Sequence, residues 1–104
     1  MKGTIIMNIN QYSDGTKLTL TIEGRIDTRT APELESVIQS VPESIDALVL
    51  DLAETVYISS AGLRVLLMAQ KMMNRQGDMT VIHVNEDLME IFDVTGFSDI
   101  LTVR

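Results

Sequence analysis

The spacing of apolar residues near the N-terminus predicts two strands joined by a tight turn. Residues 17–23 alternate strictly, with apolar side chains at every second position, namely Leu18, Leu20 and Ile22. This alternation is typical of an antiparallel strand with one solvent-facing side. Residues 4–10 predict a preceding strand with Ile5, Met7 and Ile9 on one face. Ser13-Asp14-Gly15 between the two strands favours a turn, so we expect an N-terminal β-hairpin.

A helical period replaces the strand period after Thr30. Apolar residues then recur at intervals of three and four, at Ala31, Leu34, Val37, Ile38 and Val41. Thr30 and Glu33 have the spacing of a capping box, and Pro32 occupies a first-turn position that tolerates proline. Pro42 cannot continue a helix. These residues predict a first helix that begins after Thr30 and ends before Pro42.

The central stretch passes from a buried strand to a second helix. Residues 47–52 are almost all apolar, which suits a parallel strand covered on both faces. Ser59 and Ser60 follow at the position of a helix N-cap, and Gly62 permits a tight turn. One buried helical stripe is then expected at Leu63, Leu66, Leu67 and Met73, interrupted by the polar Gln70. Gly77 is the expected C-cap of this helix.

The last third of the chain predicts one more strand and a short helix. Residues 79–84 form the strand, and Asn85 caps a helix that closes near Gly96. The buried face of this helix is expected at Leu88, Ile91 and Phe92. Residues 97–103 either add an edge strand or pack against the sheet. The order ββαβαβα, with an optional final strand, predicts a single α/β domain over residues 1–104. Its mixed sheet of four to five strands carries helices mainly on one side.

Composition narrows the functional classes. Eight basic against fifteen acidic residues give a net charge of −7, which disfavours binding to nucleic acid or anionic membranes and suits a partner with a basic patch. The absence of cysteine excludes disulfides and thiolate metal sites. No apolar run is long enough to span a membrane, and the N-terminus lacks signal-peptide features. We therefore expect a cytoplasmic protein, without cofactor or metal, that is a monomer or weak dimer.

Few residues offer catalytic chemistry. His83 is the only histidine, so a metal site would need carboxylates alone around it. A Ser60–His83 dyad is conceivable because both residues are expected near strand C-termini, but no Gly-x-Ser-x-Gly elbow is present. The pattern therefore favours a protein without catalytic residues. Met68 and Met72 fall off the buried stripe, and an exposed apolar strip there would suit a protein interface.

Two segments carry a family resemblance that extends over essentially the whole chain. Ile58-Ser59-Ser60-Ala61-Gly62-Leu63 and Gly24-Arg25-Ile26-Asp27-Thr28-Arg29-Thr30-Ala31 resemble the corresponding segments of STAS domains. This family includes bacterial anti-anti-sigma factors and the cytoplasmic domains of sulfate transporters. By this resemblance the family's phosphorylated serine falls on Ser60, and the aspartate that usually precedes it is replaced by Ser59.

The resemblance implies a STAS-like fold and an anti-sigma factor antagonist. The unphosphorylated form would bind an anti-sigma factor with serine kinase activity and release the sigma factor, phosphorylation of Ser60 would reverse the binding, and a serine phosphatase would reset the protein. The implied partner surface comprises Asp27, Thr28, Thr30, Ser59, Ser60, Ala61, Gly62, Leu63 and Arg64. The alternative is a phosphorylation-independent adaptor or ligand-sensing module in which Ser60 only caps a helix.

Overall fold

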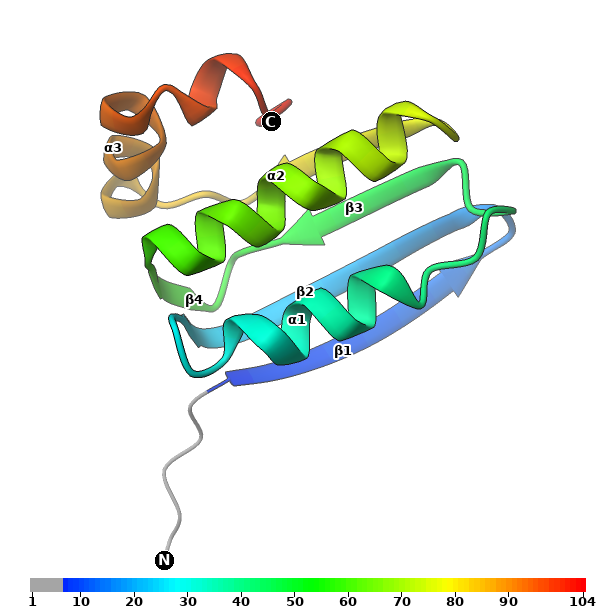
Figure 1. Cartoon of the computed structure of the whole chain (residues 1–104), viewed down its shortest axis with the longest axis horizontal. Helices are drawn as coiled ribbons and strands as arrows, with labels where there is room; N and C mark the ends of the chain where they lie inside the picture. The colour runs from blue at the N-terminus through cyan, green and yellow to red at the C-terminus, as the bar shows by residue number, and fades with distance from the viewer. Residues whose placement is uncertain (1–6) are drawn as a thin grey trace, which may run out of the picture.

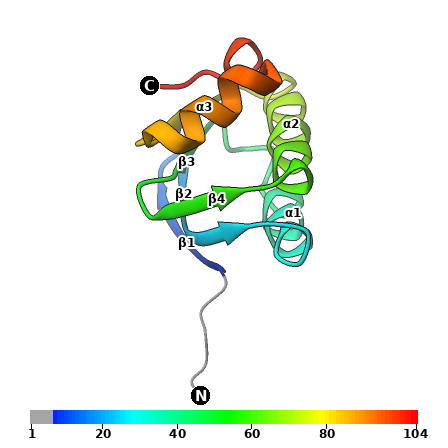
Figure 2. The same cartoon turned by 90° about the vertical axis from the view of Figure 1, so that its left-hand side faces the viewer.

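The chain folds into one layer of β-sheet with two helices on one face and a third helix at its end (Figures 1 and 2). The computed structural model describes residues 7–104, so the predicted position of Ile5 lies outside the described residues. In chain order the elements are β1 (Met7–Asp14), β2 (Lys17–Ile26), α1 (Ala31–Gln39), β3 (Ala47–Asp51), β4 (Thr55–Ile58), α2 (Ser60–Asn74), β5 (Asp78–Ile82), α3 (Glu86–Thr95) and the 3-10 turn η1 (Phe97–Asp99).

The N-terminal hairpin is confirmed. β1 and β2 pair in antiparallel register from Met7 opposite Gly24 to Asp14 opposite Lys17. Gly15 supplies the turn with a φ of 63°, a conformation that glycine adopts without a steric penalty. The alternating apolar residues of β2 are buried as the pattern predicts, at Leu18, Leu20 and Ile22.

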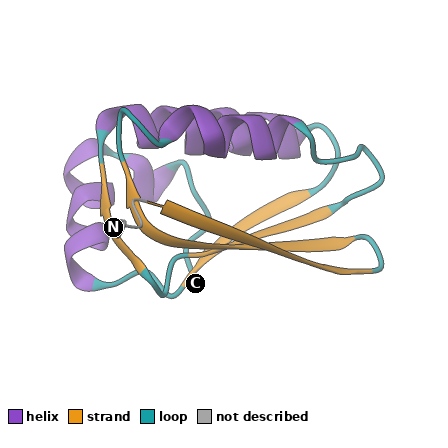
Figure 3. Ribbon diagram, turned by 90° about the horizontal axis from the view of Figure 1, so that it is seen from below, coloured by secondary structure: helices purple, strands orange, loops and turns teal. Residues whose placement is uncertain are grey.

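The remaining strands complete a mixed five-stranded sheet, which confirms the predicted α/β class. Its strand order is β1-β2-β3-β5, with β4 paired to the far end of β2, and all pairs except β1–β2 are parallel. The helices α1 and α2 lie side by side (Figure 1), and both cover the same face of the sheet, as Figure 3 shows. Between them and the sheet lies the core, whose fully buried side chains include Leu20, Ile26, Leu34, Leu50, Leu66 and Met73.

The fifth strand is not the one that the sequence pattern suggested. It is β4, between the predicted central strand and the Ser59-Ser60 pair, where the pattern predicts no strand, and it pairs with β2 through Gly24, Arg25 and Ile26. The C-terminal residues instead form η1 and one parallel bridge between Val81 and Val103. β4 has only four residues, of which two are exposed, so its apolar pattern is too short to indicate a strand.

The second helix is confirmed, but its buried face is wider than the predicted stripe. Val65, Ala69 and Gln70 are buried together with Leu63, Leu66 and Met73, whereas Leu67 is only half-buried. Gln70 keeps its amide nitrogen bonded to the Asn74 side chain at 2.9 Å. α2 therefore packs with a broad face against the sheet.

The role predicted for Gly77 is wrong. α2 ends at Asn74, Arg75 is the C-cap residue in a right-handed conformation, and Gly77 is not among the residues with positive φ. A Cβ atom at Gly77 would lie 1.9 Å from the carbonyl oxygen of Asp46. Glycine is thus required by the close approach of the loop before β3. The third helix begins and ends as predicted, at the Asn85 cap and at Gly96 with a φ of 82°.

Candidate functional site

The candidate site lies where β2 and β4 run into α1 and α2, at the end of the molecule turned toward the viewer in Figure 2. β2 leads into the residues before α1, and its neighbour β4 leads into the residues before α2. The backbone N–H of Ser59 donates to the carbonyl oxygen of Ile26 at 2.8 Å and ties the two connections together. The two segments that carry the family resemblance, about thirty residues apart in the sequence, thus meet in space.

The two adjacent serines have different roles at the start of α2. Ser59 is the N-cap, and its hydroxyl accepts a hydrogen bond from the Gly62 N–H at 3.3 Å. Ser60 is the first helical residue; it is exposed, and its hydroxyl makes no hydrogen bond among the described residues. The hypothesis that Ser60 caps the helix is therefore wrong, because Ser59 already does so. The free hydroxyl of Ser60 is available to another molecule.

Gly62 and Leu63 shape the site from within. A Cβ atom at Gly62 would lie 2.7 Å from side-chain atoms of both Ile26 and Ile58 and 2.9 Å from the Ile26 carbonyl oxygen. The first turn of α2 can approach the strand ends this closely only because the residue has no side chain. Leu63 is 6% exposed and belongs to the core. Neither residue presents a side chain to a partner.

A compact hydrogen-bonded turn precedes α1. Oδ1 of Asp27 accepts from the N–H groups of Arg29 at 3.0 Å and Thr30 at 3.2 Å. The Thr30 hydroxyl donates to the carbonyl oxygen of Arg25 and accepts from the Asp27 N–H, both at 2.8 Å. The predicted capping box is therefore wrong, because the buried Thr30 hydroxyl bonds backward to the end of β2 and not to the first turn of α1.

Asp27 is held as a carboxylate at this turn. Partial burial by itself would raise its pKa, but the hydrogen bonds from Thr30 and Arg29 and the charge of Arg25 outweigh it and lower the pKa below the usual 3.8. The Arg25 guanidinium lies 3.6 Å from Oδ2 of Asp27 and 4.4 Å from the ring centre of Tyr57 on β4. Asp27 thus stays ionised at neutral pH, beside an arginine stacked on an aromatic ring.

The nine predicted partner residues divide into an internal and an external group. The side chains of Thr30 and Leu63 and the backbone of Gly62 are buried, so they position the site. Part of the external group lines a groove of about 460 Å³ between α1 and α2, whose walls include Thr28, Ala61, Arg64 and Met68. The residues left exposed or half-exposed are Asp27, Thr28, Ser59, Ser60, Ala61 and Arg64.

His83 does not pair with Ser60. Its Nδ1 lies 2.9 Å from Oδ1 of Asp51, and the residue is exposed with a φ of 60°. Burial would raise the pKa of Asp51, but hydrogen bonds from the Ala53 N–H and from His83 outweigh it and lower that pKa. The Ser60–His83 dyad is therefore not formed. The sequence analysis missed the Asp51–His83 pair, although the parallel pairing of the two strands that end beside these residues would have indicated it.

Residues 7–104 show neither a metal site nor a membrane-spanning helix. They contain no group of three or more His, Asp or Glu side chains that could hold a metal ion. None of the helices in this part of the chain has both the length and the hydrophobicity needed to cross a bilayer. The site therefore consists of the free Ser60 hydroxyl, the ionised Asp27 and the groove beside them.

Comparisons with known proteins identify the family and the fold. The STAS domain family model matches residues 8–104. The anti-sigma-B factor antagonist of Listeria monocytogenes is 32% identical over 104 aligned residues, which cover 94% of this chain and 90% of that protein. An anti-sigma factor antagonist from Mycobacterium paratuberculosis has the same fold, with a TM-score of 0.84, 21% identity, and coverage of 99% of this chain and 89% of that chain. The phosphorylated form of the Bacillus cell fate determinant SpoIIAA superposes with a TM-score of 0.73 at 9% identity, covering 93% of this chain and 91% of that chain.

Proposed function

This chain belongs to the STAS domain family, and from that membership and the site at Ser60 we propose that it is a phosphorylation-controlled anti-sigma factor antagonist. In its unphosphorylated form it binds an anti-sigma factor that has serine kinase activity, and the sigma factor is released. Phosphorylation of Ser60 then dissociates the complex, and a serine phosphatase restores the binding form. The protein acts in the cytoplasm as a monomer or weak dimer and catalyses no reaction itself.

The observation that carries this proposal is the unused hydroxyl of Ser60. Ser59 satisfies the backbone N–H of the first turn, so Ser60 can be modified without loss of a hydrogen bond. The kinase transfers the γ-phosphoryl group of ATP to Oγ of Ser60, and ADP and the hydroxyl proton leave. That a relative of the same fold has been solved in a phosphorylated form supports a modification of this kind.

The phosphate acts at the interface and leaves the fold intact. It adds about −1.5 to −2 charges at the N-terminus of α2, where the helix dipole and free N–H groups favour an anion. The domain itself should therefore stay folded, and the loss of affinity comes from steric bulk and repulsion within the complex. A loss of about 3 kcal/mol in binding would lower the affinity more than a hundredfold.

The site also explains how Ser59 replaces the family's usual aspartate. Serine and aspartate are both good N-cap residues, and the Ser59 hydroxyl performs this function here. Serine brings no charge to position 59, so the ionised Asp27 of the turn before α1 is the acidic residue that remains in the site. Capping of α2 thus does not require a carboxylate at position 59.

The experiment is a phosphotransfer assay with matched serine variants. Anti-sigma factor kinases from the source genome are purified and incubated with ATP and the wild-type chain, Ser60→Ala or Ser59→Ala. Intact-mass and fragment spectra should show one phosphate on Ser60 in the wild type and in Ser59→Ala, and none in Ser60→Ala. Ser60→Asp should remain folded by circular dichroism and bind the kinase more than about a hundredfold more weakly.

Two results would contradict the proposal. A phosphate found on Ser59 or Thr55 would show that Ser60 is not the phosphorylated residue. Binding of the anti-sigma factor that is equally tight for wild type and Ser60→Asp would instead favour the phosphorylation-independent adaptor.

A further inference from the structure

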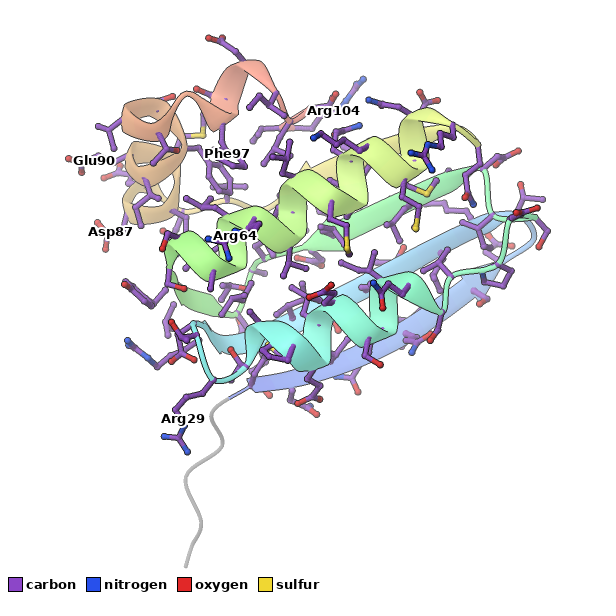
Figure 4. All side chains as sticks on the ribbon, in the orientation of Figure 1. Arg29, Arg64, Asp87, Glu90, Phe97 and Arg104 are labelled. Carbon is purple, nitrogen blue, oxygen red and sulfur yellow. The ribbon has the colours of Figure 1, made fainter. Side chains whose placement is uncertain are left out.

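The solvent-facing side of α2 carries a row of basic residues on the same face as Ser60. Arg64, Lys71 and Arg75 follow Ser60 at intervals of four, eleven and fifteen residues, which places all four on one face of the helix. The three basic residues, here called the α2 ridge, are exposed and form no ion pair among the described residues. Figure 4 shows Arg64 on the turn that begins α2.

The charge of the α2 ridge contrasts with the rest of the chain. It holds three of the eight basic residues of a protein whose net charge is −7. α2 contains no acidic residue over its fifteen positions, whereas α3 begins with Glu86 and Asp87 and also carries Glu90 and Asp93. A local positive field of this kind on an acidic protein selects a negatively charged partner surface.

Apolar side chains lie directly beside the α2 ridge. Leu67, Met68 and Met72 are half-buried and, with the ridge residues, line a groove of about 430 Å³. This groove shares Arg64 and Met68 with the groove next to Thr28 and Ala61. One continuous surface therefore leads from Ala61 to Arg75 along α2, and Glu35 of α1 is the acidic residue that lines it.

We propose that the α2 ridge and its groove bind an acidic segment of the anti-sigma factor that also carries apolar side chains. The inference rests on the proposed function and names the chemistry of the partner surface. Carboxylates would pair with Arg64, Lys71 and Arg75, and apolar side chains would contact Leu67, Met68 and Met72. The net charge of −7 suits a basic patch on the partner elsewhere, whereas the basic residues along α2 favour an acidic segment at this surface.

This arrangement gives phosphorylation an electrostatic effect on the interface. Ser60 and Arg64 are one helical turn apart, so a phosphate on Ser60 lies next to the first cation of the ridge. About −1.5 to −2 charges would offset about half to two thirds of the ridge's three positive charges. The phosphate therefore repels the acidic partner segment and also weakens the field that attracts it.

The test compares two lysines in one binding assay. The anti-sigma factor kinase that binds the wild-type chain is titrated with Lys71→Glu, on the ridge, and with Lys17→Glu, an exposed lysine at the start of β2. Both variants change the net charge equally. Lys71→Glu should weaken binding about tenfold or more and flatten the dependence of Kd on salt concentration, whereas Lys17→Glu should change Kd less than about twofold.

The outcomes separate the inference from the proposed function. If no anti-sigma factor binds the wild-type chain, the proposed function fails and this inference fails with it. If the wild type binds the anti-sigma factor but both lysine variants bind as tightly, or are weakened equally, only the inference about the α2 ridge is wrong.

Two further measurements would assign this surface to another occupant. Self-association of the wild type that Lys71→Glu abolishes, measured by sedimentation velocity, would assign the surface to a second copy of this chain. Lys71-dependent binding to anionic lipid vesicles would assign it to a membrane; either result overturns the proposed partner.

Discussion

The segments that lead into α1 and α2 lie side by side, yet they use their polar groups in opposite ways. Before α1, the Asp27 carboxylate and the Thr30 hydroxyl are both engaged in hydrogen bonds to the local backbone. Before α2, one hydroxyl suffices to cap the helix, and the next residue, Ser60, keeps its hydroxyl free. The first segment is built to hold its shape, and the second leaves a nucleophilic oxygen exposed.

This difference indicates which polar residues a partner can change. A hydroxyl that satisfies buried backbone groups, as Thr30 does, cannot be modified without a cost to folding. The Ser60 hydroxyl bonds to no backbone group within residues 7–104, so a phosphate there should affect partner binding and leave the stability of the fold nearly unchanged. The rigid turn at Asp27 and the free hydroxyl at Ser60 thus form complementary halves of one surface. Substitutions on the two sides of the site test this division.

Thr30→Val should be the most destabilising of these changes. Valine keeps the shape of threonine but removes the donor to the Arg25 carbonyl and the acceptor for the Asp27 N–H, at a cost of about 1–3 kcal/mol. Thr28→Val, at an exposed position in the same turn, is the matched control and should change the free energy of unfolding by less than about 0.5 kcal/mol. Urea unfolding measures both. Equal midpoints would show that the Thr30 bonds do not hold the turn.

The alanine variants of Ser59 and Ser60 should differ in stability by a smaller amount. Ser59→Ala removes the N-cap of α2 and should lower the free energy of unfolding by about 1 kcal/mol. Ser60→Ala removes a hydroxyl that has no hydrogen-bond partner within residues 7–104 and should change the free energy of unfolding by less than about 0.5 kcal/mol. Thermal unfolding followed by circular dichroism compares the two. A larger loss from Ser60→Ala would mean that the assignment of the cap is reversed.

The ionised state of Asp27 should make the smallest contribution to the free energy of unfolding, and its pH dependence identifies that contribution. Because folding lowers its pKa below 3.8, the carboxylate contributes stability that is fully present above the unfolded pKa and disappears as pH falls through the folded pKa. Asp27→Asn keeps an acceptor oxygen but cannot ionise. The difference in stability between wild type and Asp27→Asn should be constant near neutral pH and shrink below pH 3.8. A difference that stays constant down to pH 2 would rule out a contribution from the ionised carboxylate.

Local signals and the family resemblance together indicated where the candidate site lies. The serines before a helical period marked one connection and the resemblance of Gly24–Ala31 to STAS domains marked the other, and the structure brings the two together through the Ser59–Ile26 hydrogen bond. The choice of cap between Ser59 and Ser60 could not be predicted. It depends on the backbone conformation of one residue, and Ser59 is extended at a ψ of 177° because its N–H is bound to the end of β2. The α2 ridge was also missed, because it emerges only when the buried face of α2 is known.

The sequence by itself determined the elements whose partners are near in the chain. The Gly15 hairpin, the alternation in β2 and the Asn85 cap of α3 all follow from interactions within a few residues. Only the tertiary structure decided the features that depend on distant neighbours. β4 is a strand because β2 offers it free backbone groups, and Gly77 is required because the Asp46 carbonyl oxygen approaches it. The Thr30 hydroxyl turns to the end of β2 because the carbonyl oxygen of Arg25 lies within reach. Local periodicity indicates which side of a helix or strand is buried. The hydrogen-bond partners of buried backbone N–H and C=O groups, in contrast, depend on which segments the fold brings together.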